Sequence, residues 1–479
     1  MQTNVIKRKL FTGVIWETIG QFLSLIIQFG VTIIIARVLL PDDFGVVGLL
    51  IVFVAIGNIL LDSGFSQALI QKKEANNLDF SSVFYVNLFV GLCLYALFYV
   101  ISPYIAQFYE IPELTRYARI LFLIIPITSL GLIQNVLIQK QMEFRKTAVA
   151  SLVAALVSGC LGIGLAYRGF GIMALVVQQI TMYSVRTLMY FIQRRWLPKR
   201  YFSLKAVKEI FTFSMNLMFH SLINTVFKNI DTLIIGKYYA TSEVGYYNQA
   251  KKFEEISAST ITSIIVKVSF PALVQFKDDV EKVKMAYKKI TAMTFFVVCP
   301  LMFLLICIAP PLFRILLTEK WMPAVPYFQL LCLYGLTLPI MQISYNIYKL
   351  YKKGKFLVRI DLIRHVLFLI SILLTIKHGI TTLLVGLFVV MFIMSFVNMY
   401  FSGKLINYSV KEQILQAFPY YATSFVAGVL VWILPYIKND IITLSAYIPV
   451  FAIIYIIGAK IFKLNAYAEI QNIIIKRRI

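Results

Sequence analysis

Polar side chains line one side of two otherwise apolar stretches of this sequence. The first stretch carries them at i, i+4, i+7 and i+11: Glu17, Gln21, Ser24 and Gln28. The second carries them at i, i+4, i+8 and i+11: His220, Asn224, Lys228 and Asp231. This spacing places each set on one face of a helix. Because polar groups inside a bilayer are costly unless they face protein or water, both faces are predicted to line a hydrated cavity.

The chemistry available in such a cavity is the binding of an anion. Lys228, Lys251 and Lys252 supply ammonium groups, which would stabilise a pyrophosphate in a medium of low dielectric constant. The candidate substrate contacts are Lys228, Lys251, Lys252, Asn224, Gln28 and Gln21. Glu17 and Asp231 are candidates for charge balance or for binding a coupling H⁺ or Na⁺. Ordinary hydrogen bonds between helices, with Lys228 and Asp231 paired at i, i+3, are the alternative interpretation.

No cofactor other than such an ion is expected. The three histidines do not cluster, and the five cysteines lie in apolar runs without CxxC spacing, so neither a metal site nor a disulfide framework is indicated. The sequence contains no Walker A motif and no nucleophile elbow, which are signatures of two large enzyme classes. The protein is therefore expected not to be an enzyme.

The elements that carry these residues are predicted to be membrane-spanning helices. Hydrophobic residues make up 60% of the 479 positions, and the mean hydropathy is +0.81. Apolar runs of about 20 residues, enough to cross a roughly 30 Å hydrocarbon core, recur along the chain. The predicted fold class is an all-α polytopic membrane protein with about 14 transmembrane helices, at residues 11–36, 44–62, 81–107, 116–138, 147–167, 171–192, 209–236, 245–272, 289–317, 324–348, 356–376, 380–402, 415–435 and 441–462.

The sequence contains two copies of one pattern. Thr32–Arg37 and Gly45 correspond to Thr232–Lys237 and Gly245, 200 positions later, and further matches keep their order through each half. Two parallel repeats of this kind are a construction typical of transporters, although chance similarity between Ile-rich helices is the alternative. Residues 1–195 and 209–402 are predicted to form two six-helix lobes, joined by a basic cytoplasmic linker at 196–208. Residues 403–479 are predicted to form two extra transmembrane helices and a cytoplasmic tail.

The repeated segment also predicts its local structure. Arg37 and Lys237 are expected to cap helix C-termini at the outer interface, where a cation interacts favourably with the helix dipole. Pro41, Gly45 and Gly245 are expected to shape the hairpin turns.

Basic residues indicate the orientation in the membrane. The chain has 46 Lys and Arg against 22 Asp and Glu, a formal charge of +24, and every second connection is rich in Lys and Arg. The other connections carry few basic residues: Arg37, Arg116, Arg168, Lys237, Lys320, Lys377 and Lys438. The positive-inside rule therefore places both termini in the cytoplasm, and nucleic acid is not an expected partner. Further charged groups in the eleventh span are expected to snorkel to the inner interface: Arg359, Asp361, Arg364 and His365.

Several motifs resemble a known family. In the first repeat these are Trp16, Ala36–Gly45 (ARVLLPDDFG) and Asp62–Lys72 (DSGFSQALIQK). In the second repeat they are Asn229–Lys237, Gly245–Ala250, Phe270–Leu273 and Lys320–Ala324. With these motifs the chain resembles the polysaccharide transporter family, the Wzx- and WzxC-like flippases of the multidrug/oligosaccharidyl-lipid/polysaccharide superfamily.

The resemblance implies two six-helix lobes, often with two extra helices, and transport of an oligosaccharide linked to undecaprenyl pyrophosphate across a bacterial inner membrane by alternating access. The expected partners are this lipid-linked oligosaccharide, membrane lipids and the machinery that polymerises the polysaccharide. Related lipid II flippases hold the pyrophosphate with cavity arginines, whereas this chain has lysines in its seventh and eighth spans. A multidrug-type exporter on the same fold and a membrane-embedded glycan-processing enzyme are the alternative functions.

Overall fold

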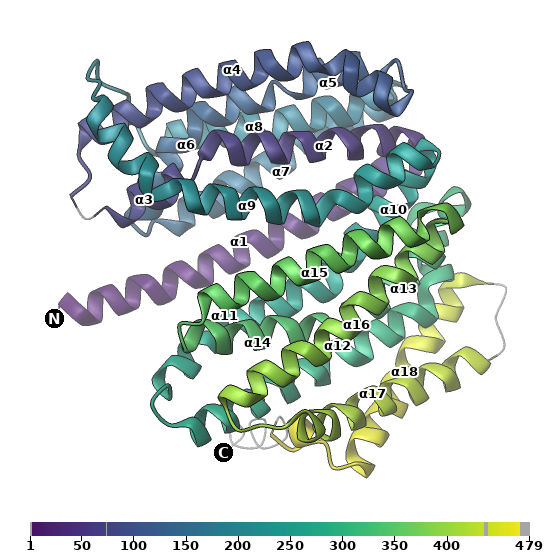
Figure 1. Ribbon diagram of the computed structural model, residues 1–479. Coiled ribbons are helices and arrows are strands. Elements are labelled where there is room, and N and C mark those ends of the chain that lie inside the picture. Colours follow the sequence, from purple (N-terminus) through teal and green to yellow (C-terminus); the bar gives the residue numbers. More distant parts are fainter. Residues whose placement is uncertain (1, 73, 435–438, 470–479) are drawn as a thin grey trace. The chain divides into compact units, whose positions relative to one another are not determined.

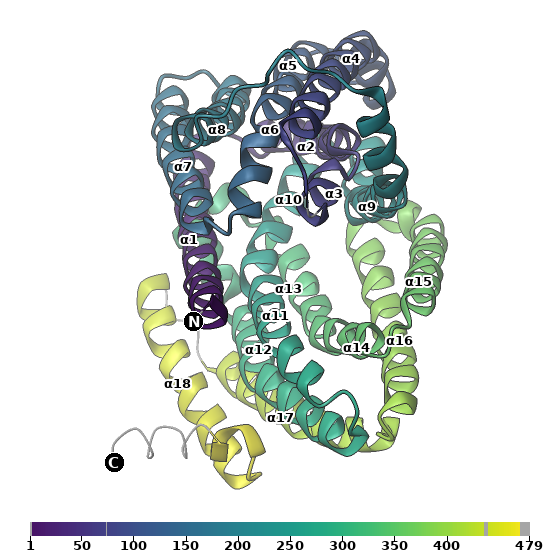
Figure 2. The ribbon, with the colours of Figure 1, turned by 90° about the vertical axis from the view of Figure 1, so that its left-hand side faces the viewer.

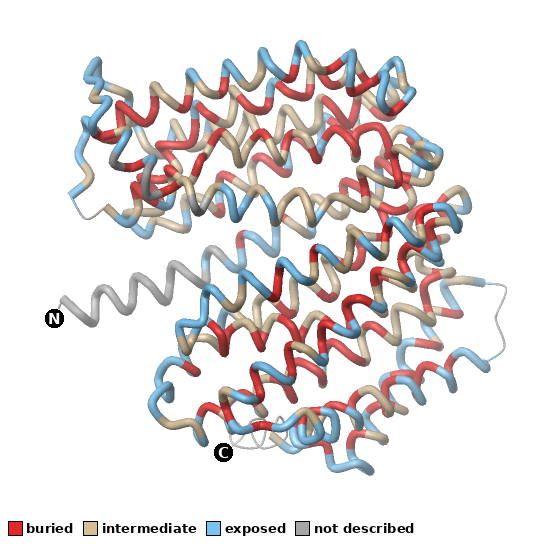
Figure 3. Tube along the Cα trace, in the orientation of Figure 1, coloured by how far each residue is buried: buried red, intermediate tan, exposed pale blue. Residues whose placement is uncertain are grey.

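The computed structural model describes residues 2–72, 74–434 and 439–469, and all regular structure in those ranges is helical. The chain divides into two compact units, Met1–Gly245 (unit 1) and Tyr246–Ile479 (unit 2). The long helices within each unit run roughly parallel to one another (Figures 1 and 2). Along most helices buried residues alternate with exposed ones (Figure 3), as expected where one side packs and the other faces lipid.

Unit 1 contains the first nine helices and the start of the tenth. They are α1 (Gln2–Val38), α2 (Pro41–Asp62), α3 (Phe65–Gln71), α4 (Asn77–Tyr109), α5 (Leu114–Leu121), α6 (Ile124–Lys140), α7 (Phe144–Tyr167), α8 (Ile172–Gln193), α9 (Leu204–Tyr238) and α10 (Thr241–Glu254).

Unit 2 begins within α10 and continues through a π-helical turn, Glu255–Ser259. Its further helices are α11 (Thr260–Gln275), α12 (Val280–Leu317), α13 (Ala324–Gly335), α14 (Leu338–Leu350), α15 (Gly354–Thr375), α16 (Ile380–Leu405), α17 (Val410–Ile433) and α18 (Asp440–Ile461), with 3-10 turns at Glu319–Trp321 and Ile376–His378.

The predicted all-α membrane fold is confirmed. Each of the fourteen predicted spans coincides with a helix or with consecutive helices. Among the described residues, twelve such segments are long and apolar enough to cross a membrane. The other two are α9, with 35 residues, and α15, with 22 residues; both contain several charged residues.

Two predicted spans are broken at corresponding places in the two repeats. The span predicted at 116–138 is interrupted between α5 and α6, and the span predicted at 324–348 is interrupted between α13 and α14. Pro126 and Pro339 lie just after these breaks. A proline ring clashes with the carbonyl four residues earlier and donates no backbone hydrogen bond, so a continuous helix is disfavoured there.

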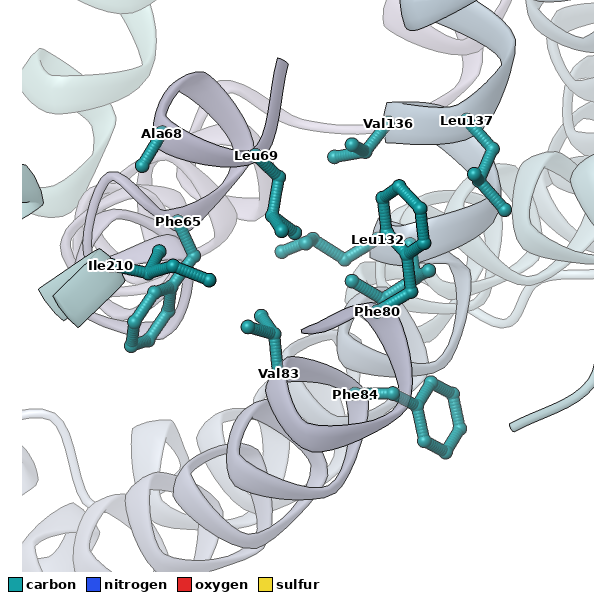
Figure 4. Packing of buried hydrophobic residues seen from close by; sticks show 11 residues of the cluster. Phe65, Ala68, Leu69, Phe80, Val83, Phe84, Leu132, Val136, Leu137 and Ile210 are labelled. Atoms are coloured by element: carbon teal, nitrogen blue, oxygen red, sulfur yellow. The ribbon is translucent and has the colours of Figure 1, made fainter. Parts of the chain in front are cut away.

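Unit 1 is held together by packing around α6, α7 and α9. Helix α7 packs along α1 and α8, and α9 packs against α2, α3 and α4. In Figure 1, α9 runs beside α2 and α3. Figure 4 shows a buried cluster where α3, α4, α6 and α9 meet. Its members are Phe65, Ala68, Leu69, Phe80, Val83, Phe84, Leu132, Ile133, Val136, Leu137 and Ile210.

The connection between α8 and α9 is fixed to the start of α4. The Trp196 indole donates a hydrogen bond to Asn77 Oδ1 (3.2 Å), and the backbone N–H of Ser203 donates to Ser82 Oγ (2.9 Å). The start of α4 is itself capped by the Asn76 side chain, which accepts from the backbone N–H groups of Leu78 and Asp79. This basic connection therefore has a defined path over unit 1.

The glycines of the repeated pattern have a different role from the predicted one. Gly45 lies inside α2 and Gly245 inside α10, so neither forms a turn; Pro41 occupies the first turn of α2. A Cβ atom at Gly45 would lie 2.0 Å from the Thr241 carbonyl oxygen, and one at Gly245 would lie 2.0 Å from the Pro41 carbonyl oxygen. The two glycines thus allow the starts of α2 and α10 to cross in contact.

In unit 2, α12 is the central helix. It contacts α11, α13, α14, α17 and α18, several of which surround it in Figure 2. Helices α17 and α18 also pack against each other. A buried cluster that includes Ile308, Ala427, Tyr447 and Phe451 joins these three helices.

Candidate substrate site

The polar face of α1 is partly turned into unit 1. Ser24 is buried, and its hydroxyl donates to the Ser151 carbonyl of α7 at 3.4 Å. The Gln28 amide donates to Ser24 Oγ at 3.1 Å, whereas Gln21 is exposed. The side chain of Glu17 lies outside the part of the chain that the structure describes. At Ser24 the interhelical hydrogen bonding considered as the alternative is therefore present, whereas Gln28 bonds within α1.

The polar face of α9 contains local hydrogen bonds. The Asn224 amide lies 3.1 Å from the His220 ring nitrogen Nδ1. Asp231 is half-buried and accepts from the backbone N–H of Thr232 at 2.8 Å. Lys228 is exposed. These residues share one side of α9, as their spacing predicts.

The remaining two candidate lysines belong to unit 2. Lys251 and Lys252 are both half-buried near the end of α10. The Lys251 ammonium lies 5.5 Å from the centre of the Tyr247 ring, a cation–π distance. Gln21, Gln28, Asn224, Lys228 and Asp231 all belong to unit 1.

Unit 1 contains a polar cavity that the sequence did not reveal. Its volume is about 210 Å³. It is lined by α2, α3, α6 and α8 through Asn58, Leu61, Asp62, Ser66, Thr128, Gly131, Leu132, Asn135, Tyr183, Arg186, Thr187 and Tyr190. We call it the unit 1 cavity.

The unit 1 cavity brings an acid and a base together within a membrane-spanning bundle. Asp62 Oδ1 accepts from the backbone N–H of Ser66 at 3.0 Å, and the Arg186 guanidinium lies 5.4 Å from the centre of the Tyr183 ring. Within the described residues, Asp62 and Arg186 form no ion pair, and Arg186 Nε and Asn58 Oδ1 are buried without a protein hydrogen-bond partner. An unmatched donor and an unmatched acceptor in the lining of one cavity suit a hydroxylated ligand, because each hydroxyl both donates and accepts.

Helical spacing could have identified the two polar faces that line this cavity. Asn58 and Asp62 are at i, i+4 in the second span. Tyr183, Arg186 and Tyr190 are at i, i+3 and i+7 in the sixth span. Both patterns are polar faces of the kind recognised on the first and seventh spans. What the spacing could not reveal is that these two faces meet.

A second buried polar cluster lies in unit 2, where snorkelling was expected. Asp361 pairs with Arg364 at 3.0 Å and accepts from the Tyr345 hydroxyl at 2.5 Å. Arg364 also lies 3.3 Å from His365 Nε2. Asp361 and His365 are buried, and Arg359 is exposed. The expectation of snorkelling is therefore wrong for Asp361 and His365, because both side chains are buried and Asp361 is bound by Tyr345 of α14.

Lys237, the basic residue that ends the second copy of the repeated pattern, binds the end of another helix. The Lys237 ammonium donates to the Phe108 carbonyl (2.7 Å) and to Glu110 Oε1 (2.9 Å). Lys237 thus caps the C-terminus of α4. This hydrogen bond and the charge of Lys237 hold the pKa of Glu110 below its ordinary value of 4.5.

Several known proteins are similar to this chain in sequence. Teichuronic acid biosynthesis protein TuaB of Bacillus subtilis (strain 168) is 27% identical over 339 residues, 70% of each chain. Succinoglycan biosynthesis transport protein ExoT of Rhizobium meliloti (strain 1021) is 28% identical over 318 residues, 66% of this chain and 64% of its own. Lipopolysaccharide biosynthesis protein WzxC of Escherichia coli (strain K12) is 25% identical over 333 residues, 69% of this chain and 68% of its own.

Solved structures share the fold at lower identity. The lipid II flippase MurJ in an inward closed conformation superposes with a TM-score of 0.76 and 18% identity, covering 94% of this chain and 98% of MurJ. An inward-facing multidrug resistance transporter of the MATE family superposes with a TM-score of 0.61 and 16% identity, covering 80% and 94%. A family model described as "Polysaccharide biosynthesis protein" matches residues 34–326, more than half of the chain. This multi-pass membrane protein belongs to the polysaccharide biosynthesis protein family.

Proposed function

We propose that this protein is a flippase that moves an oligosaccharide linked to undecaprenyl pyrophosphate from the cytoplasmic to the periplasmic leaflet of a bacterial inner membrane. The observation that carries the proposal is the unit 1 cavity, where Asp62 and Arg186 lie within a membrane-spanning bundle of this family. Ionisable groups within membrane-spanning segments are costly and mark the paths of polar solutes. The relatives named for succinoglycan transport and for lipopolysaccharide biosynthesis support the same substrate class.

The proposed mechanism is alternating access between the two repeats. The glycan enters a polar interior while the polyprenyl chain stays in lipid. Lys228 and one of Lys251 or Lys252 contact the pyrophosphate as charged donors. Glu17 and Asp231 balance this charge or bind a coupling H⁺ or Na⁺. Arg186 and Asn58 in the unit 1 cavity bind hydroxyl groups of the glycan.

The protein would work with both termini in the cytoplasm, as the distribution of basic residues indicates. Its partners would be the lipid-linked oligosaccharide, membrane lipids and the polysaccharide polymerase machinery. We propose transport and not catalysis, because the relatives include a named transport protein. A multidrug-type exporter is the second candidate, favoured by the fold shared with MATE transporters. The proposed lysine contacts argue against it, because they suit an anionic ligand.

A reconstituted flipping assay tests the proposal. Purified protein is placed in liposomes that contain a fluorescent undecaprenyl-pyrophosphate oligosaccharide, and access of a membrane-impermeant reagent is followed over time. We expect transfer by the wild type and at least a tenfold loss in Lys228→Ala and in Arg186→Gln. The matched control is Lys377→Ala, since Lys377 is exposed in a turn outside both sites.

The outcomes separate the function from the site. Transfer that is unaffected by Lys228→Ala and Arg186→Gln would retain the flippase and reject these contacts. Absence of transfer under every ion gradient, together with movement of a drug-like cation, would favour the multidrug exporter.

A further inference from the structure

We propose that unit 2 binds the phosphate headgroup of an anionic glycerophospholipid in a pocket beside the last transmembrane helix. The pocket has a volume of about 700 Å³, within the usual range for small-molecule sites. Its walls are the start of α12, the start of α17 and residues 462–469, which follow α18. We call it the tail pocket. The tail pocket shares no lining residue with the unit 1 cavity and contains none of the proposed pyrophosphate contacts, so it is a separate site.

The segment after α18 is a fixed wall of the tail pocket. Leu464 and Ala466 are buried. The backbone N–H of Ala466 donates to the Tyr420 hydroxyl on α17 at 3.4 Å, and the Tyr467 ring lies 6.5 Å from Phe296 on α12. These contacts hold the segment against both helices and define one side of the pocket.

The two acids of the tail pocket are neutralised by lysines. Glu469 pairs with Lys289 at 3.0 Å. Glu412 lies 3.8 Å from Lys284 and also accepts from the backbone N–H of Ser409 at 2.9 Å. Neither carboxylate is therefore available as the sole counter-ion of another lysine.

Two further lysines of the tail pocket have no carboxylate within ion-pair distance among the described residues. They are Lys288 and Lys463. Lys288 lies with its ammonium 4.6 Å from the centre of the Tyr408 ring, and Lys463 is exposed. The lining contains three lysines, Lys288, Lys289 and Lys463, against two acids, and such an excess of positive charge is what a phosphate group requires. A zwitterionic headgroup would add an ammonium group to these lysines, so an anionic headgroup is favoured.

Hydrogen bonds of Gln416 fix the structure around Lys288. The Gln416 amide donates to the Lys288 carbonyl at 2.6 Å, and Gln416 Oε1 accepts from the Tyr408 hydroxyl. One side chain thus fixes both the backbone of Lys288 and the ring beneath its ammonium. Positioning of this kind lowers the entropy lost when a ligand binds.

The rim of the tail pocket is apolar and points to a lipid as the source of the phosphate. Met285, Leu415 and Phe462 line it and are each at least 60% exposed. Met285 and Leu415 lie on membrane-spanning helices and Phe462 directly follows one. Exposed apolar side chains at such positions face acyl chains, so a phosphate bound here can belong to a molecule whose chains cover the rim. Basic pockets between transmembrane helices are known headgroup sites.

Lipid binding to the purified full-length protein tests the proposal. Native mass spectrometry would compare phosphatidylglycerol, phosphatidylethanolamine, undecaprenyl phosphate and inorganic phosphate as probes. We expect phosphatidylglycerol to bind best and the variant Lys288→Gln/Lys463→Gln to bind it about thirtyfold more weakly, at about 1 kcal/mol per lysine. The charge-preserving variant Lys288→Arg/Lys463→Arg should retain binding and show that the fold is intact.

The matched control is Lys349→Gln/Lys404→Gln, because both lysines are exposed on unit 2 and neither lines the tail pocket. If this control loses as much phosphatidylglycerol binding as Lys288→Gln/Lys463→Gln does, the assignment of the binding site to the tail pocket is overturned. Equal binding by wild type and Lys288→Gln/Lys463→Gln would do the same. Preference for undecaprenyl phosphate or for inorganic phosphate would overturn the assignment to a glycerophospholipid. The readout is binding, so it is independent of the flipping assay.

Discussion

The buried ion pair between Asp361 and Arg364 contributes to stability in a way that depends on its surroundings. The two side chains are 3.0 Å apart and mostly buried, and the Tyr345 hydroxyl binds the same carboxylate. The gain from such a pair is offset by the cost of removing both charges from water. Removing one partner, in contrast, leaves an uncompensated buried charge.

We therefore predict that Asp361→Ala lowers the free energy of unfolding by about 3 kcal/mol. The double variant Asp361→Ala/Arg364→Met should be less destabilised than the single variant, because it buries no lone charge. Equilibrium unfolding in detergent would measure both values. Glu143→Ala is the control, since the Glu143–Lys146 pair has the same i, i+3 spacing but is more exposed; its expected cost is below about 1 kcal/mol.

Glu110 gives a prediction about pH. Its carboxylate accepts a hydrogen bond from Lys237, and its pKa is lowered from 4.5. The stabilising effect is fully present above pH 4.5 and is lost as the pH falls through the lowered pKa. Carbon NMR of labelled glutamate should give a midpoint below 4.5 for Glu110, and Lys237→Gln should raise it. An unchanged midpoint in this variant would show that Lys237 does not stabilise the carboxylate.

At the scale of elements, the crossing of α2 and α10 depends on the missing side chains of Gly45 and Gly245. Each glycine faces a backbone carbonyl that a Cβ atom would meet at 2.0 Å. Backbone cannot rotate away as a side chain can, so one helix would have to move. The requirement is therefore for close approach and does not arise from glycine's freedom in φ.

We predict that Gly45→Ala and Gly245→Ala each destabilise the protein by about 1–3 kcal/mol. Thermal unfolding in detergent would show this as a lower midpoint. Gly30→Ala and Gly164→Ala are matched controls, because a Cβ atom at either position has no neighbour within 4 Å. Alanine favours a helix over glycine, so these controls should be neutral or stabilised. A similar loss in all four variants would contradict the steric explanation.

At the scale of the whole molecule, the distribution of basic residues predicts the orientation in the membrane. The connection between α4 and α5 is expected on the periplasmic side, and the connection between α11 and α12 on the cytoplasmic side. In a background without the five native cysteines, Glu113→Cys should react with an impermeant maleimide in intact spheroplasts. Glu281→Cys should react after permeabilisation alone. Labelling of Glu281→Cys in intact spheroplasts, with Glu113→Cys protected, would contradict the orientation. Equal labelling of the two variants would place both sites on one side of the membrane and would contradict the odd number of spans predicted between them.

Much of the fold could be predicted from sequence because the signals are local. Apolar length identifies a membrane-spanning segment without knowledge of its neighbours, and all fourteen predicted segments are helical. The breaks before Pro126 and Pro339 could not have been placed from proline chemistry alone, because Pro300 and Pro310 lie inside the unbroken helix α12. The predicted ligand contacts of Lys228, Lys251 and Lys252 stay predictions.

Sequence alone thus determined the class of the protein, its repeated pattern and the polar faces of individual helices, since hydropathy and helical period are properties of short segments. The tertiary structure decided which faces meet. It brought Asn58 and Asp62 of α2 to Arg186 of α8 around one cavity, and it placed Lys237 on the end of α4. Such pairings depend on packing between segments that are distant in sequence, and helical spacing within one segment carries no information about its neighbour.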